Sequence, residues 1–169
     1  MISKKSEYVF LSSFCLFIVF VFVFAKTTLY SLESENTIEQ EIAHVTFYNL
    51  YDEEIVFECE IADTFDERSQ GLIYREEIDD DKGMLFVYNT SDMRCYWMKN
   101  CLIPLDIIFI DEDNRIINIE HGQVQYDIDD SELNRYCSQR PAKYVVEINQ
   151  GICEDYNIIS GGIVKFEQS

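Results

Sequence analysis

Basic residues are scarce in this sequence of 169 residues: 13 Lys and Arg stand against 32 Asp and Glu, a formal net charge of −19. The imbalance lies after Lys26, where only 10 basic residues accompany 31 acidic ones. A segment this acidic repels the phosphates of nucleic acids and anionic lipid headgroups. We therefore predict that nucleic acid is not a partner and that the acidic surface keeps the soluble domain monomeric.

Common metal and nucleophile patterns are also absent. The sequence has no Cys-x-x-Cys pair, and its two histidines, His44 and His121, do not have the spacing of a metal-binding pair. The acidic runs at residues 79–81 and 127–132 lack the register of the EF-hand calcium loop. No Gly-x-Ser-x-Gly nucleophile elbow is present either. We predict no metal, no cofactor and no assignable catalytic residue.

One long apolar run is present, at the N-terminus. Residues 8–25 are almost entirely apolar and lie between Lys5 and Lys26, so they are long enough to cross a bilayer as one helix. The run predicts either a membrane anchor or a cleaved signal sequence whose small-residue site ends at Ala25, and its length favours the anchor. Both alternatives place the rest of the chain outside the cytoplasm, and cleavage would make the protein secreted.

The chain therefore divides into three parts. Residues 1–26 are the anchor or signal sequence, residues 27–43 form a polar tether, and residues 44–169 form one domain. Of the six cysteines, Cys15 lies in the apolar run and an odd number follows it. Outside the cytoplasm disulfides can form, so we predict at least one among the remaining cysteines, with connectivity left open.

β-Rich segments separated by turns make up most of the domain. Hairpins are predicted for residues 45–62 and 105–120, because each holds two such segments around an acidic turn. Thr64 followed by Glu67 predicts a capping box that begins a short helix ending near Gly71. Further strands are predicted at residues 84–88, 93–98, 143–149 and 162–167, a second short helix at 150–156, and a long loop at 123–139.

About eight short strands and two short helices predict a mainly β fold, in the range from all-β to α+β. The expected architecture is an antiparallel sandwich or partly closed barrel, preceded by one N-terminal transmembrane helix.

Several motifs occur in a fixed order along the domain. Arg68-x-x-Gly71-Leu72-x-x-Arg75 comes first and Gly83-Met84-Leu85-Phe86 second; Tyr96-Trp-Met-Lys-Asn-Cys-Leu-Ile-Pro-Leu-Asp-Ile-Ile-Phe109 and Pro141-Ala-x-Tyr-Val-x-Glu147, with Gly151 after it, follow. Together they resemble the domain of unknown function 192 over roughly residues 45–167. The resemblance agrees with a mainly β domain. The family has no established activity, so the resemblance implies no substrate.

Polar residues inside the apolar run at 96–109 are the best candidates for chemistry, since buried polar groups must be paired or serve a site. The candidate ligand-binding residues are Arg75, Trp97, Lys99, Asn100 and Asp106. In this interpretation Lys99 and Arg75 receive an anion beside Trp97. The favoured alternative is structural: Asp106 pairs with Arg68, Arg75 or Lys99 and fixes a helix on the sheet. The remaining motif residues, which we expect to be structural, are Arg68, Gly71, Gly83, Met84, Pro104, Tyr144, Glu147 and Gly151.

These observations favour a membrane-anchored, extracytoplasmic binding or accessory module whose small-molecule or protein partner is unknown. Two alternatives stay open. One is an envelope-associated hydrolase with Asp106 or Glu147 as acid or base. The other is a protein-interaction domain that has no ligand pocket.

Overall fold

The computed structural model describes residues 41–168, and strands dominate them. The predicted transmembrane helix at residues 8–25 and Cys15 lie outside the described residues. Within residues 41–168, no helix is long and apolar enough to cross a membrane. The elements in chain order are β1 (Ile42–Tyr48), β2 (Glu54–Ala62), α2 (Phe65–Gln70), β3 (Lys82–Asp92), β4 (Cys95–Tyr96), β5 (Leu105–Ile110), β6 (Ile116–Gly122), the 3-10 turn η1 (Asp130–Glu132), β7 (Tyr136–Cys137), β8 (Ala142–Asn149), α3 (Ile152–Asp155) and β9 (Val164–Gln168).

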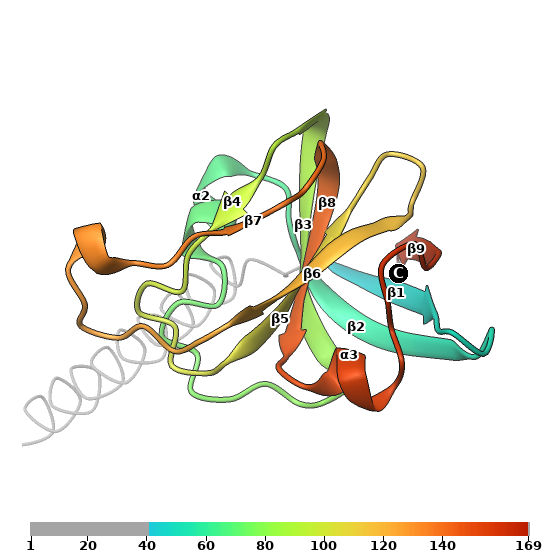
Figure 1. Cartoon of the computed structure of the whole chain (residues 1–169), viewed down its shortest axis with the longest axis horizontal. Helices are drawn as coiled ribbons and strands as arrows, with labels where there is room; N and C mark the ends of the chain where they lie inside the picture. The colour runs from blue at the N-terminus through green and yellow to red at the C-terminus, as the bar shows by residue number, and fades with distance from the viewer. Residues whose placement is uncertain (1–40, 169) are drawn as a thin grey trace, which may run out of the picture. The chain divides into compact units, whose positions relative to one another are not determined.

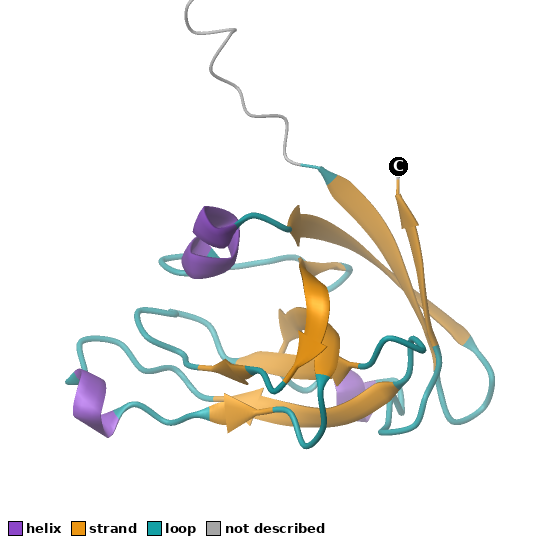
Figure 2. Cartoon of the chain, turned by 90° about the horizontal axis from the view of Figure 1, so that it is seen from above, coloured by secondary structure: helices purple, strands orange, loops and turns teal. Residues whose placement is uncertain are grey.

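Seven of the strands form one curled sheet, in the order β6-β5-β8-β3-β2-β1-β9 (Figure 1). Figure 2 shows the curl: β9, which ends at the marked C-terminus, and its neighbour β1 stand steeply against the lower strands. The sheet is therefore an open half-barrel, which confirms the predicted mainly β fold with two short helices. Both predicted hairpins are present, as β1–β2 and β5–β6.

One strand pair departs from the predicted antiparallel arrangement, because β2 and β3 run parallel. Two parallel strands need a crossover connection of a dozen or more residues. Residues 63–81 supply it, with α2 inside the crossover. This crossover carries α2 onto one face of the sheet, where it later forms a wall of a cavity.

Two hydrophobic cores lie on the two faces of the sheet. The first draws residues from all seven strands, including Phe47 and Ile148. The second covers the other face of β5, β8 and β3, and includes Phe86, Phe109 and Val145. Successive side chains of a strand point to opposite faces, so β8 supplies Val145 to one core and Ile148 to the other.

The helix α2 begins as predicted. Thr64 accepts a hydrogen bond from the Glu67 backbone N–H, and the Glu67 side chain accepts one from the Thr64 backbone N–H. This capping box satisfies two of the N–H groups that a helix start leaves unpaired. The helix ends at Gly71, whose φ of 47° favours glycine. A Cβ there would lie 3.4 Å from the Phe86 ring, so the turn after α2 approaches β3 closely.

The strands β4 and β7 form a separate two-stranded ribbon. A disulfide between Cys95 and Cys137 links the two strands, and Cys59, Cys101 and Cys153 are buried thiols. The predicted disulfide is thus present. The ribbon itself differs from the prediction in two ways: the strand expected at residues 93–98 is reduced to two residues, and the loop expected at 123–139 contains β7 and η1.

Candidate functional site

Of the five predicted ligand-binding residues, only Lys99 and Asn100 line the same cavity. Arg75 forms an ion pair with Glu60 beside one cavity, and Lys99 pairs with Asp130 beside a second, where Asn100 donates a hydrogen bond to the Tyr74 hydroxyl. Trp97 lines a third cavity. The expected anion pocket shared by Lys99 and Arg75 is therefore absent from the described part of the chain.

Asp106 is fully buried on the face of the sheet opposite the second core. Its Oδ2 accepts hydrogen bonds from the backbone N–H groups of Gly151 (3.1 Å) and Cys153 (3.0 Å), and its Oδ1 lies 2.7 Å from His121 Nδ1. The expected partners Arg68, Arg75 and Lys99 do not contact it. Asp106 does fix a helix on the sheet, as the structural alternative predicts, but the helix is α3 and the partners are His121 and backbone amides.

Most other motif residues are scaffold. A Cβ on Gly83 would lie 2.6 Å from the Glu147 carbonyl oxygen, so only glycine allows β3 and β8 to approach this closely. Pro104 accepts a hydrogen bond from the Gln150 N–H, and the Tyr144 ring packs 4.6 Å from that of Phe166. Met84, buried in the second core, pairs with Glu147 across the strands.

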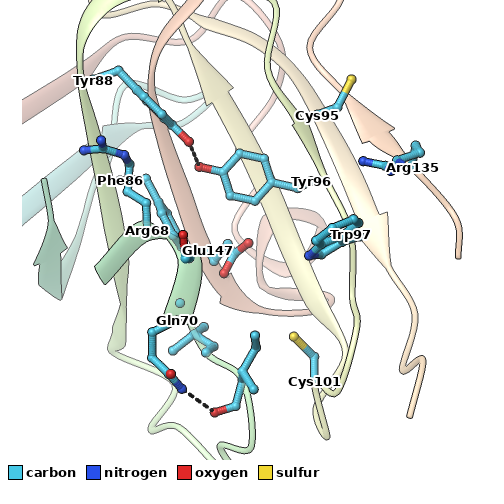
Figure 3. Close-up of a pocket in the computed structure, with 14 residues that line it drawn as sticks. Arg68, Gln70, Phe86, Tyr88, Cys95, Tyr96, Trp97, Cys101, Arg135 and Glu147 are labelled. Carbon is cyan, nitrogen blue, oxygen red and sulfur yellow. Dashed lines mark hydrogen bonds between the residues drawn. The ribbon is translucent and has the colours of Figure 1, made fainter. Parts of the chain in front are cut away.

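Glu147 is different, because it lines a cavity. The cavity has a volume of about 320 Å³ and is bounded by α2 and the turn after it, by β3, by the β4–β7 ribbon and by β8. In Figure 3 the carboxyl of Glu147 lies at its centre, with Tyr96 and Trp97 on one side and Arg68 and Phe86 on the other. The lining residues are Arg68, Ser69, Gln70, Gly71, Leu72, Ile73, Phe86, Tyr88, Cys95, Tyr96, Trp97, Cys101, Arg135 and Glu147.

Aromatic rings form much of the wall. The Tyr96 ring meets the Phe86 ring edge to face, with the centroids 5.2 Å apart, and the Tyr96 and Tyr88 hydroxyls lie 2.8 Å apart and hydrogen bond to each other. Burial, and then the neighbouring Tyr88 and Glu147, raise the pKa of Tyr96 well above its ordinary value, so its hydroxyl stays neutral. The wall is therefore uncharged on this side.

Two arginines lie at the cavity, and both are held by other groups. The Arg68 guanidinium donates hydrogen bonds to the carbonyl oxygens of Asp63 and Val87, and lies 4.8 Å from the centre of the Tyr88 ring. Arg135 stacks 4.6 Å over the Trp97 ring. Within residues 41–168 neither arginine has a carboxylate partner.

Glu147 is the buried charge-bearing group of the cavity. It lies in the middle of β8, where it pairs with Met84 of β3 and Ile107 of β5, and its exposed fraction is 5 %. No group within residues 41–168 hydrogen bonds to its carboxyl. Because burial disfavours the charged form, it raises the pKa of Glu147 to about 8. At neutral pH this carboxyl is mostly protonated.

The thiol of Cys101 shares the cavity with Glu147. Burial, and then the nearby carboxyl of Glu147, raise the pKa of Cys101 to about 12. A thiol is a nucleophile only as its thiolate, so Cys101 is a lining residue and not a reactive one. Cys137 is in the disulfide and has no free thiol.

Sequence reasoning identified Glu147 as a motif residue and a possible acid or base, but did not place it in the pocket. It missed Tyr88, Cys101 and Arg135 as pocket residues. The sequence did contain a signal for Glu147. Its neighbours Val145, Val146 and Ile148 are apolar residues of a central strand, and a charged group is costly to bury at such a position.

Comparison with known proteins identifies one family and two similar solved structures. The family model DUF192, described as an uncharacterised ACR, matches residues 49–166. A solved protein of unknown function from Novosphingobium aromaticivorans DSM 12444 is 35% identical, with a TM-score of 0.69 over 77% of this chain and 89% of that chain. A candidate transcription regulator from Sinorhizobium meliloti 1021 is 26% identical, with a TM-score of 0.70 over 78% of this chain and 98% of that one. No curated protein matches.

The solved chain from Sinorhizobium meliloti is matched over 98% of its length, so a chain that consists of little more than this domain adopts the same fold. We therefore choose residues 27–169 for measurements on the domain.

We predict that Asp106→Asn destabilises the domain, because the amide cannot replace a carboxylate that accepts from two backbone N–H groups and faces His121. The expected loss is about 1–3 kcal/mol in the free energy of unfolding, measured by urea unfolding. Asp113→Asn, on the exposed β5–β6 turn, is the control and should change little. An unfolding curve for Asp106→Asn equal to that of wild type would contradict this role.

A second prediction concerns pH. In the unfolded chain Glu147 titrates near its ordinary value of 4.5, and in the folded protein near 8. Between these values the folded protein holds a proton that the unfolded chain has lost. The stability contributed by protonated Glu147 is therefore fully present below pH 4.5 and is lost as pH rises through 8, at roughly 1.4 kcal/mol per pH unit.

Glu147→Gln keeps the shape and cannot titrate, so its free energy of unfolding should rise relative to wild type from pH 5 to pH 8. Urea unfolding at several pH values measures the difference. The free energy of unfolding of Glu76→Gln, a change at an exposed position, should vary with pH as that of wild type does. A Glu147→Gln profile that also runs parallel would show that the carboxyl is not buried as described.

Proposed function

The chain belongs to the DUF192 family, whose function is not known, and from this premise we propose that it is a binding module whose cavity around Glu147 takes a small molecule. The module would act outside the cytoplasm, tethered to a membrane by residues 8–25. Trp97 is the one predicted ligand-binding residue that lines this cavity.

The observation that carries the proposal is the carboxyl of Glu147, which opens into a cavity of about 320 Å³ and receives no hydrogen bond from the described residues. No fully buried side-chain oxygen within residues 41–168 lacks a partner, so this carboxyl is accessible from the cavity. The volume is within the usual range for small-molecule sites, and a bound ligand would supply a partner for the carboxyl. The same cavity counts against a protein-interaction domain without a pocket.

An envelope-associated hydrolase is the second candidate. A pKa of about 8 for Glu147 is close to neutral pH, where general acid–base groups are most effective. Asp106 does not support this role, because it is fully buried and already accepts its hydrogen bonds. Turnover of a ligand that is lost in Glu147→Gln, while binding is kept, would favour the hydrolase.

The proposed location rests on two observations. The apolar run at residues 8–25 is long enough for a membrane-spanning helix, and the disulfide between Cys95 and Cys137 suits an oxidising compartment. The description of the Sinorhizobium protein as a candidate transcription regulator concerns that protein alone. The net charge of −19 supports a monomeric domain that does not bind nucleic acid.

The binding proposal predicts that a ligand raises the melting temperature of residues 27–169. A thermal-shift screen of metals, sugars, nucleotides, peptides, amines and small anions would find it. Trp97 is the only tryptophan and lines the cavity, so a true ligand should also change the intrinsic fluorescence.

A blocking variant locates the site. Ile73→Phe enlarges a half-buried side chain that lines the cavity and should abolish the thermal shift. Val124→Phe, the control, also enlarges an apolar side chain, but at an exposed position outside the cavity, and should leave the thermal shift unchanged. Stabilisation that survives Ile73→Phe, or a screen without any stabilising compound, would contradict the proposal.

The location predicts that the full chain sediments with membranes and resists alkaline extraction, and that protease added outside intact cells digests the domain. Deleting residues 1–26 should move the protein to the soluble fraction. A full chain found in the cytosol, or protected from external protease, would contradict the proposed tether.

A further inference from the structure

We propose that the ligand of this cavity carries a protonated amine, and that Glu147 is the residue that receives it. The inference rests on the proposed function, since it names the chemical class of the ligand for that same site. Three features of the cavity support it: Glu147 is the one acidic side chain of the lining, aromatic rings surround its carboxyl, and neither lining arginine pairs with it.

Glu147 is the only acidic side chain among the lining residues. Several other polar side chains of the lining are committed to neighbours: the Tyr88 and Tyr96 hydroxyls bond to each other, and the Gln70 amide donates to the Ile73 carbonyl oxygen at 3.5 Å. The remaining donors of the lining, on Trp97, Cys101 and Arg135, make no hydrogen bond to Glu147. Its carboxyl is therefore open to a donor that a ligand brings. An ammonium group brings several donors and a charge of the right sign.

The aromatic wall suits the same group. Phe86, Tyr96 and Trp97 surround the carboxyl in Figure 3, from the strand β3 and from the segment at β4. Ring faces attract cations, and they do so most strongly where water is excluded. Arg135 already stacks over the Trp97 ring, so Phe86 and Tyr96 are the rings left for a ligand. A carboxyl beside several rings is thus complementary to an amine attached to an apolar body.

Neither of the two arginines that line the cavity forms an ion pair with Glu147 within residues 41–168. Arg68 is held by two backbone carbonyls and Arg135 by the Trp97 ring. Burial is the only cause that raises the pKa of Glu147, and no arginine lowers it. The charge of the whole domain also favours a cation, since 31 acidic and 10 basic residues follow Lys26 and such a field concentrates cations at the surface.

A neutral ligand that accepts a hydrogen bond from protonated Glu147 is the competing possibility. With a pKa of about 8, ionising Glu147 at pH 7 reduces affinity only about tenfold. A charge-assisted hydrogen bond to a carboxyl that is only 5 % exposed recovers more than that. When the amine binds, the carboxyl proton moves to the buffer, so binding at pH 7 releases close to one proton.

The test uses three probes that share a phenyl ring and differ in the head group: 2-phenylethylamine, 2-phenylethanol and phenylacetate. Binding to residues 27–169 is followed by Trp97 fluorescence and by calorimetry in two buffers of different ionisation enthalpy. The amine should bind at least tenfold more tightly than the alcohol and the acid, and should release close to one proton at pH 7.

Glu147→Gln should weaken binding of the amine at least tenfold, leave the alcohol within about twofold, and abolish proton release. Glu76→Gln, an exposed carboxyl outside the cavity, should behave as wild type. Circular dichroism confirms that both variants are folded.

The outcomes separate the two proposals. If the alcohol or the acid binds as tightly as the amine, or if Glu147→Gln binds the amine unchanged, the cavity binds small molecules but the amine inference is overturned. If none of the three probes binds, the amine inference is also overturned. The binding function is then decided by the wider thermal-shift screen and its Ile73→Phe variant.

Discussion

The strand β8 lies between β5 and β3 and has a hydrophobic core on each of its faces. Side chains in the middle of this strand, from Val145 to Ile148, are buried, so a polar side chain at such a position is enclosed by protein. The carboxyl of Glu147 occupies one of these positions, and that of Asp106 occupies a comparable one on β5, on the opposite face. The two buried carboxyls differ in their partners: Asp106 is bonded by its own chain and stabilises the scaffold, whereas Glu147 is not and marks the candidate site.

Asp106 is satisfied by donors from its own chain. Two backbone N–H groups at α3 and the His121 ring meet it, so it holds α3 and β6 together and has no capacity left for a ligand. Glu147 has no such donors, and the protein keeps it neutral by burial instead. A buried acid without a partner costs stability. Its presence at a cavity is understood most simply if something outside the chain supplies the partner.

The walls of the cavity come from parts of the chain that do not belong to the sheet. The helix α2 and its following turn form one side, and the β4–β7 ribbon with its disulfide forms another. The sheet supplies a fixed floor that places Glu147, Phe86 and Tyr88, while these covering segments determine the width and the aromatic character of the opening.

Local patterns predicted local structure well. The capping box of Thr64 and Glu67 and the two hairpins depend on residues close in sequence, and they are present as predicted. The parallel pairing of β2 with β3 and the β4–β7 ribbon depend on residues far apart, which periodicity does not encode. For the same reason, Lys99 and Arg75 were grouped with Trp97 in one site predicted from the sequence. In the structure, ion pairs hold Lys99 and Arg75 beside other cavities. The burial of Asp106 was predictable; its partners were not.

The most direct test of this account is the titration of the Glu147 carboxyl itself, followed by carbon NMR of glutamate-labelled residues 27–169, with Glu147→Gln used to assign the signal. The account predicts a midpoint at about 8 in the ligand-free protein. A midpoint near the ordinary value of 4.5 would mean that the carboxyl is hydrated or already paired, and would remove the basis for a ligand site at this residue.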